Sequence, residues 1–415
     1  MDSRDKEINP GTSAQAEAVP ETIPETIPET EEPSGGKKKK KRVGIIKRVK
    51  DSGFFNLTMK IYFAVFFAAV IIYLLSRWIP GFAEFWSRYP SVGIRFVLAK
   101  LTGWIPFSLA EVLLVSLPVT VIWYLIASSV STKRDNSMRN FNRWLRPAVC
   151  LILTVFIIFF AGFGTAYGRR TIGDNLGLER GDITAQDLYD TASTIAGKLN
   201  ELTDEIVFDG EGASVMPYGY DEMVRKVNEA YEKFAADADF ITHFDTYAKP
   251  VALSYPMTFT HISGVYTFFT GEANVNVNYP DFINPYTVAH EMSHQRGIAR
   301  EDEANFAAFL VCIASDDVYV RYSGYANMLR DLTTALSAAD FELYALFRIG
   351  EMPQKLDKEF AAFSDFFDEY RDSTASKISQ GVNDTFLKSQ GQSAGSKSYG
   401  LVVDLAVSYY KNGKM

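Results

Sequence analysis

The 415-residue chain has only two cysteines, Cys150 and Cys312. Two cysteines cannot build a disulfide framework, which excludes the class of small disulfide-stapled secreted proteins. Glycine and proline number 28 and 16, which excludes a collagen-like chain. Histidine is also rare, with four residues in the whole chain. A motif that contains two of these four histidines is therefore a specific signal.

Charge is divided unevenly along the chain. Residues 1–170 contain 23 Lys and Arg against 13 Asp and Glu, whereas residues 171–415 contain 19 against 37, giving net charges of +10 and −18. A basic front part with long uncharged runs, followed by an acidic and more polar part, predicts a membrane anchor joined to a soluble domain. The acidic part argues against nucleic acid as a partner, because phosphate binding needs clustered Lys and Arg.

We expect residues 1–55 to form a disordered acidic, proline-rich tail that ends in a polybasic segment. Repeats of Pro-Glu-Thr-Ile begin at Pro20 and Pro24, and this composition has too little apolar surface to offset the entropy lost on ordering. Five lysines follow at positions 37–41, with four more basic residues before residue 51. A basic cluster directly before an apolar run favours contact with the anionic lipids of the cytoplasmic membrane.

Residues 56–168 contain three uncharged runs long enough to cross a membrane. The runs are Ile61–Ser76, Val112–Val130 and Pro147–Gly168. A transmembrane helix needs about 20 predominantly apolar residues, so the sequence predicts a membrane domain with three transmembrane helices. The segment Pro80–Pro106 has basic and aromatic residues among its apolar ones, and we expect it to lie along the membrane interface.

The basic residues around these runs predict the orientation. Five of them lie between the second and third runs: Lys133, Arg134, Arg139, Arg143 and Arg146. Short basic loops stay in the cytoplasm, and the lysine cluster at 37–41 agrees with that side. Three crossings from a cytoplasmic N-terminus place residues 169–415 outside the cytoplasm, in a multi-pass protein of the cell membrane.

Residues 169–415 predict an α+β fold, mostly helical with a small β-sheet. Helical spacing of apolar residues begins near residue 181, with Asp182 or Thr184 as a cap, and a second helix is expected over Asp221–Ala236. Alternating and β-branched residues predict strands at Val251–Tyr255, Val265–Phe269 and Gly271–Asn278. After Pro285 the chain is predicted to be helical nearly to its end.

The chemistry is concentrated in His290-Glu291-Met292-Ser293-His294. Residues four apart project from one helical face, so the two imidazoles can bind one Zn²⁺ while Glu291 acts as general base. Two ordinary buried histidines are the alternative interpretation. The specificity of the motif favours the metal site.

A catalytic zinc site needs a third protein ligand and an open position. The position six residues after His294 holds Arg300, so a metzincin-type third histidine is absent. Glu301 is the first candidate, because Asn305 lies on the same face of the next helix and could support a ligand imidazole. Glu303 is the alternative, and both carboxylates could simply favour a helix N-terminus.

The string Glu301-Asp-Glu-Ala-Asn305 after the histidine motif resembles the gluzincin arrangement. The membrane-embedded HtpX/Ste24-type and the ImmA/IrrE-type metallopeptidases share this form, in which the first Glu of the string is the metal ligand. From about Lys60 onward, the chain is similar to the domain of unknown function 3810 family, bacterial membrane-anchored proteins with the same histidine motif. Thr270-Gly-Glu-Ala-Asn-Val-Asn and Tyr322-Ser-Gly-Tyr325 contribute to this likeness.

The resemblance implies a zincin-like metallopeptidase domain at 169–415 that acts on a peptide or protein substrate. In such enzymes a strand edge beside the metal holds an extended peptide through main-chain hydrogen bonds. The expected substrate strand starts with four residues: Gly271, Glu272, Ala273 and Asn274. An ordinary structural strand is the alternative for this segment. The second functional hypothesis is a noncatalytic membrane sensor or assembly factor with a structural metal site, which would have no need of Glu291.

Overall fold

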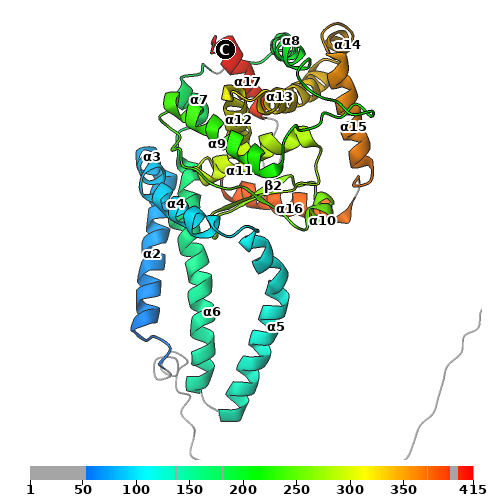
Figure 1. Ribbon diagram of the computed structural model, residues 1–415. Coiled ribbons are helices and arrows are strands. Elements are labelled where there is room, and N and C mark those ends of the chain that lie inside the picture. The colour runs from blue at the N-terminus through cyan, green and yellow to red at the C-terminus, as the bar shows by residue number, and fades with distance from the viewer. Residues whose placement is uncertain (1–52, 136–137, 180, 372, 393–400, 415) are drawn as a thin grey trace, which may run out of the picture. The chain divides into compact units, whose positions relative to one another are not determined.

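The computed structural model describes residues 53–415, except 136–137, 180, 372, 393–400 and 415 (Figure 1). Nearly all of the predicted tail, including the lysine cluster, lies outside the described residues. Residues 48–415 form one compact unit. The predicted boundary at residues 168 and 169 therefore falls between segments that pack against each other within this unit.

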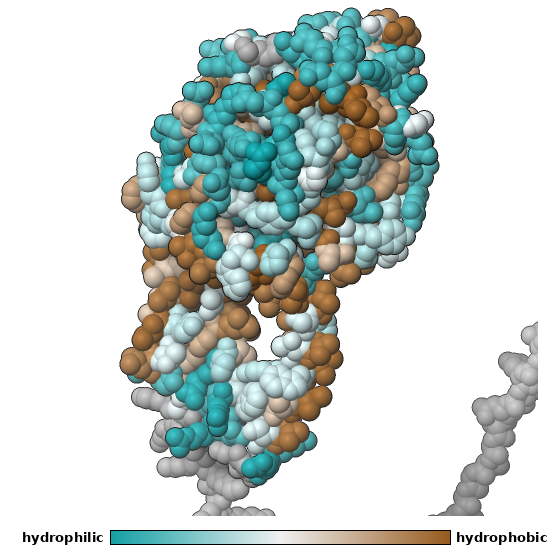
Figure 2. Space-filling view, viewed as in Figure 1, coloured by the Kyte–Doolittle hydropathy of each residue, from teal (hydrophilic) through white to brown (hydrophobic). Residues whose placement is uncertain are grey.

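Three helices are long and apolar enough to cross a membrane, as the uncharged runs predict. They are α2 (Leu57–Trp78), α5 (Leu109–Asp135) and α6 (Met138–Ile158), the last extended by η1 (Phe159–Phe163) and η2 (Gly164–Gly168). Most of their large apolar side chains are exposed in the absence of lipid. Figure 2 shows this hydrophobic surface around the three long apolar helices and a more hydrophilic surface over the rest of the protein.

Two short helices, α3 (Pro80–Arg88) and α4 (Pro90–Gly103), connect α2 to α5. Each has proline in its first turn, where the missing backbone N–H costs nothing. Neither is long enough to cross a membrane. They fill the segment expected to lie along the interface, and α4 packs against η1 and the small sheet.

Helices dominate the remainder of the chain. The helix α8 (Ala185–Leu202) starts with a capping box in which Thr184 and Asp187 bond each other's backbone N–H groups, and α9 (Tyr220–Asp237) matches the second predicted helix. The short helices are α7 (Ile172–Leu176), α10 (Ser254–Thr258) and η3 (Asp281–Ile283). The C-terminal series comprises α11 (Asn284–Gln295), α12 (Glu301–Ala314), α13 (Val318–Ala339), α14 (Phe341–Gly350), α15 (Gln354–Asp368), α16 (Thr374–Ser389) and α17 (Val402–Lys411).

The sheet has three strands in the order β1-β3-β2. The central strand β3 (Glu272–Val275) pairs antiparallel with β2 (Gly264–Thr267) and parallel with the two-residue β1 (Lys249–Pro250). The strand predicted at Val251–Tyr255 is wrong, because the observed strand β1 ends at Pro250. Val251 N–H still bonds Val275 of the sheet, but the next two N–H groups bond the Glu111 carboxylate of α5, and the chain then turns into α10.

We call residues 169–415 the folded part. Its hydrophobic core surrounds α12. Its side chains Phe306, Ala307, Phe309 and Val311 are fully buried, and it packs between α11 and α13, with α9 and α17 also against it. The predicted α+β class, three apolar helices followed by a mostly helical part with a small sheet, is confirmed.

Candidate metal centre

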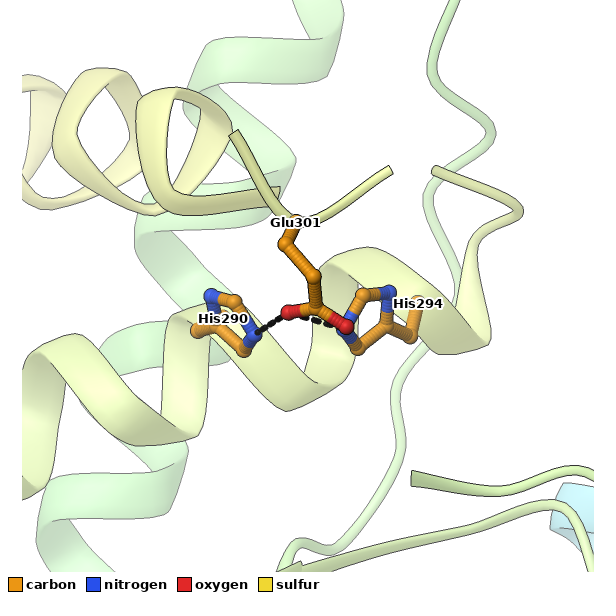
Figure 3. Close-up of side chains that lie close together, drawn as sticks. All are labelled: His290, His294 and Glu301. Carbon is orange, nitrogen blue, oxygen red and sulfur yellow. Dashed lines mark ion pairs between the residues drawn. The ribbon is translucent and has the colours of Figure 1, made fainter. Parts of the chain in front are cut away.

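The helix α11 carries both histidines of the motif. Asn284–Gln295 contains no glycine, and Pro285 occupies its first turn. Val288, Ala289 and Met292 are fully buried against the core, which fixes the rotation of the helix. His290 and His294 consequently share the neighbouring face (Figure 3).

A tight turn after α11 returns the chain toward the histidines. Gly297 adopts φ of +91°, a left-handed conformation that side chains rarely tolerate. Its N–H bonds the His294 carbonyl at 2.9 Å, and the Ile298 N–H bonds the Ser293 carbonyl at 3.0 Å. The second helix, α12, then begins at Glu301, the first residue able to place a side chain over α11.

Glu301 reaches both imidazoles from α12 (Figure 3). Its Oε2 lies 3.3 Å from His290 Nε2 and 3.5 Å from His294 Nε2. Ligand-capable atoms of all three residues lie within 4.8 Å of one another. All three side chains are largely buried, with at most 15% of any one exposed.

These three donors match the requirements of zinc. Two imidazole nitrogens and one carboxylate oxygen form a recognised ligand set for a catalytic zinc site. With metal–ligand distances near 2.0–2.1 Å, a tetrahedral arrangement separates ligand atoms by about 3.3 Å, close to the two separations that Glu301 makes. Among the described residues this is the only such group of His, Cys, Asp or Glu, and it leaves a fourth position for water or substrate.

Glu303 points elsewhere. Its Oε1 accepts a bond from Arg300 Nη1 at 2.9 Å, and it belongs to no ligand group. Burial raises the pKa of the Glu303 carboxyl to about 7, although Arg300 acts in the opposite direction. Of the two carboxylates proposed from the sequence, the structure brings Glu301 to the histidines and keeps Glu303 in an ion pair.

A backbone carbonyl orients His294. The Ile298 carbonyl lies 2.7 Å from His294 Nδ1, which leaves Nε2 directed at Glu301. The sequence predicts that Asn305 supports a ligand imidazole, but no hydrogen bond joins its side chain to either imidazole in the described part of the chain. His290 Nδ1 is buried without a hydrogen-bond partner among the described residues, and Asn305 contributes only its carbonyl, to the Tyr286 hydroxyl.

His294 and Glu301 shift each other's pKa values. Burial alone would lower the pKa of His294, but the neighbouring Glu301 carboxylate raises it to about 9. Burial also opposes ionisation of Glu301, yet the two imidazoles hold the pKa of its carboxyl well below the ordinary range. A cation bound by these groups would displace the proton that the raised pKa of His294 favours.

Glu291 occupies the same helix between the ligands but faces the sheet. It is 3% exposed, and its Oε2 has no hydrogen-bond partner among the described residues. Burial raises the pKa of the Glu291 carboxyl to about 7, against the lowering effect of the two histidines. Burying a carboxylate oxygen without a hydrogen-bond partner costs free energy. A carboxyl group with a pKa near 7 can accept and release a proton near neutral pH.

The structure corrects the predicted substrate strand. Glu272, Ala273 and Asn274 are buried in the central strand β3, where all three pair with β2 and Asn274 also pairs with β1. Gly271 precedes this strand. The Glu272 carboxylate instead accepts the N–H groups of Leu109 and Ala110 at the start of α5. These residues join the sheet to the apolar helix α5 and cannot pair with a peptide.

The strand beside the metal helix is β2. A Cβ atom on Gly264 would lie 2.5 Å from Glu291 Oε1, so β2 passes directly over the base. The Asn276 N–H bonds the Ser263 carbonyl, and alternation along an antiparallel pair then turns the backbone groups of Gly264 and Tyr266 away from β3. No described strand covers this edge.

Residues from the third apolar span, from β2 and from α4 surround the metal centre or support its helix. The ring of Phe163, at the end of the third apolar span, lies 6.1 Å from the His294 ring, and that of Tyr266 lies 6.4 Å away. Arg95 of α4 is fully buried and donates to the carbonyls of Gln295 and Gly162 at 3.0 and 2.8 Å, tying the end of α11 to η1. No local sequence pattern marks these residues, since each acts through partners far along the chain.

Three side chains are of a type that could stabilise a developing oxyanion: Arg321, Tyr322 and Tyr399. Tyr399 lies outside the described residues, and the other two bond other groups. The Tyr322 hydroxyl donates to the buried Glu359 carboxylate, and Arg321 binds the carbonyls of Ser315 and Asp316. Both are bonded outside the ligand group formed by the two histidines and Glu301.

Comparison with known proteins gives one match. No curated protein and no solved structure matches this chain. One family model matches residues 87–407, which include α4, the sheet, both histidines and Glu301. The match covers most of the chain, which therefore belongs to the family described as "Protein of unknown function (DUF3810)".

Proposed function

We propose that this protein is a membrane-anchored zinc-dependent peptidase. The observation that carries the proposal is the convergence of His290, His294 and Glu301 beside Glu291. Structural zinc sites are closed by four protein ligands, whereas catalytic sites use three and keep a position open. A structural site would also have no use for a buried carboxylate such as Glu291, which argues against a noncatalytic sensor.

The residues have distinct roles in this proposal. His290, His294 and Glu301 hold Zn²⁺, which when bound polarises the scissile carbonyl and lowers the pKa of water. Glu291 accepts a proton from the attacking water at its carboxylate and later passes it to the leaving amine. The Ile298 carbonyl keeps His294 in the tautomer that presents Nε2.

The edge of β2 supports a peptide as substrate. Its outward backbone groups at Gly264 and Tyr266 lie next to Glu291, where an extended chain could add as a further strand. Val265, between them, turns its side chain to the opposite face and is 41% exposed. A main-chain edge of this kind binds peptides with modest dependence on side chains.

The same proposal places the metal centre outside the cytoplasm. The end of α5 and the start of α6 carry the basic residues Lys133, Arg134, Arg139, Arg143 and Arg146. In Figure 1 these helix ends lie on the side away from the small sheet and the later helices. Basic loops of this kind remain cytoplasmic. The substrate would then be an extracytoplasmic peptide or protein.

Hydrolysis of a labelled peptide library by the full-length chain in nanodiscs, loaded with zinc, tests the function. We expect cleavage by the wild type and none by Glu291→Gln, which removes the base but none of the ligands. Metal content of both proteins is the control, because the variant must keep its zinc for the comparison to concern catalysis.

Two outcomes count against the peptidase. One is a wild-type protein with one zinc per chain that cleaves no peptide in the library. The other is a Glu291→Gln variant that cleaves at the wild-type rate.

A further inference from the structure

The helix α16 exposes its large apolar side chains. Ile378, Val382 and Phe386 recur every fourth residue, which aligns them on one face, and they are 63%, 67% and 40% exposed. We call these three residues the α16 stripe. The buried positions of this helix are Ser376 and Leu387. An apolar stripe turned outward on a helix predicts a contact with something other than water.

The C-terminal end of α16 reaches the membrane helices. The Gln390 side chain accepts a bond from the Tyr73 hydroxyl at 3.0 Å, and its carbonyl accepts one from Arg77 at 2.6 Å. Tyr73 lies five residues before Trp78, the end of α2, which is about 7 Å along a helix. The end of α16 therefore lies level with the final turns of a membrane-spanning helix.

Phe386 of the stripe lies beside the third apolar span. Its ring is 6.3 Å from that of Phe159 and 6.4 Å from that of Tyr167. Both partners belong to the apolar segment that is long enough to cross a membrane. Phe159 and Tyr167 are themselves buried, and Phe156, one turn before Phe159, is 47% exposed, so the exposed side of Phe386 lies near the exposed apolar surface of that segment.

The other end of α16 is held near the start of α5. Ser373, its cap, donates to the Phe259 carbonyl just after α10. The segment before α10 is bonded to α5 through Glu111, which accepts the N–H groups of Ala252 and Leu253 at 2.9 and 2.7 Å. In Figure 1, α16 accordingly crosses the side of the folded part that faces the membrane helices.

We propose that α16 is a membrane-interface helix and that the α16 stripe contacts the lipid bilayer. The occupant follows from continuity, since lipid that surrounds the exposed surfaces of α2 and the third span also reaches Phe386 at their level. Lys388 is exposed on the same helix, in an ion pair with Asp384, and basic residues beside an apolar face favour anionic headgroups. The proposal concerns the lipid contact and does not depend on peptidase activity.

Site-directed spin labelling of the full-length chain in nanodiscs tests this contact. The native cysteines are replaced by Cys150→Ser and Cys312→Ala, and one label is introduced by Ile378→Cys or Val382→Cys. Exposed positions on other faces of α16, Lys377→Cys and Gln380→Cys, are matched controls. The measured quantity is the ratio of collisions with oxygen, which concentrates in lipid, to collisions with a water-soluble nickel chelate.

We expect this ratio to be several-fold higher at 378 and 382 than at 377 and 380. Equal, low ratios at all four positions would show a stripe in water and overturn the proposal. Protection from both reagents at 378 and 382 would show a protein partner or a second copy of the chain instead, and would also overturn it.

A second measurement removes the dependence on the cysteine replacements. A photoreactive phenylalanine analogue at position 382, in the chain with both native cysteines, should crosslink to phospholipid. A crosslink to protein as the dominant product would contradict the lipid contact.

Discussion

Gly264 of β2 lies against the carboxylate of Glu291, so closely that a Cβ atom at 264 would meet Oε1 at 2.5 Å and the Thr287 methyl group at 2.8 Å. Real Cβ atoms do not approach oxygen this closely, so either the strand or the carboxylate would have to move. The strand edge and the base are therefore positioned by one contact, and both belong to the proposed catalytic apparatus.

The first prediction follows from that contact. Gly264→Ala should lower peptide hydrolysis by roughly 100-fold, since small displacements of catalytic groups cost about this much, while zinc content stays unchanged. Gly197→Ala in α8 is the matched control, because a Cβ there meets nothing within 4 Å. Equal activity of the two variants would show that the approach of β2 to Glu291 has no catalytic importance.

The second prediction concerns orientation. A reporter fused after Met415 should respond as extracytoplasmic and one fused after Arg134 as cytoplasmic, because the basic loop between α5 and α6 should stay inside. Activities of paired reporters, one active only in each compartment, provide the measurement. A cytoplasmic response from the C-terminal fusion would invert the proposed location of the metal centre.

The third prediction concerns pH and the buried carboxyl of Glu359. This group is 1% exposed and accepts bonds from the Ser214 N–H and the Tyr322 hydroxyl. Burial raises its pKa from 4.5 to about 7, although the Ser214 bonds lower it. Because the folded protein binds this proton more tightly, the associated stability is present below pH 4.5 and is lost as pH rises through 7.

Thermal unfolding in detergent between pH 5 and 8 measures this effect. Wild type should lose on the order of 3 kcal/mol of stability relative to Glu359→Gln over this range, from about 1.4 kcal/mol per pKa unit. The difference between the two proteins isolates Glu359 from other titrating groups. Parallel pH profiles would show that the buried carboxyl does not change its protonation on unfolding.

Local sequence patterns predict the elements that carry the site. Apolar runs predict the three long helices, because membrane spans are encoded by continuous local composition. Thr184, one of the two caps predicted, starts α8, and the four-residue spacing places His290 and His294 on one face. Glu301 follows from its position at the start of the next helix. Each of these features depends on neighbours within one or two turns.

Predictions from the sequence are wrong or lacking for features that depend on partners far along the chain. The strand pattern at Val251–Tyr255 is interrupted because Glu111 of α5 captures two of its N–H groups. Glu272 could not be identified as a partner for α5, or β2 as the free edge, since strand order is set by tertiary packing. The support of His294 by a backbone carbonyl likewise has no side-chain signature in the sequence.

Metal analysis of the full-length protein, purified without chelator as wild type, Glu301→Gln and Glu303→Gln, tests the central claim most directly. Wild type should carry about one zinc per chain, because two imidazoles and the Glu301 carboxylate converge. Glu301→Gln should lose zinc affinity by about 10-fold or more, while Glu303→Gln, which alters only the pair with Arg300, should retain the metal. Wild-type protein without zinc, or loss of zinc from Glu303→Gln alone, would contradict the assignment of this metal centre.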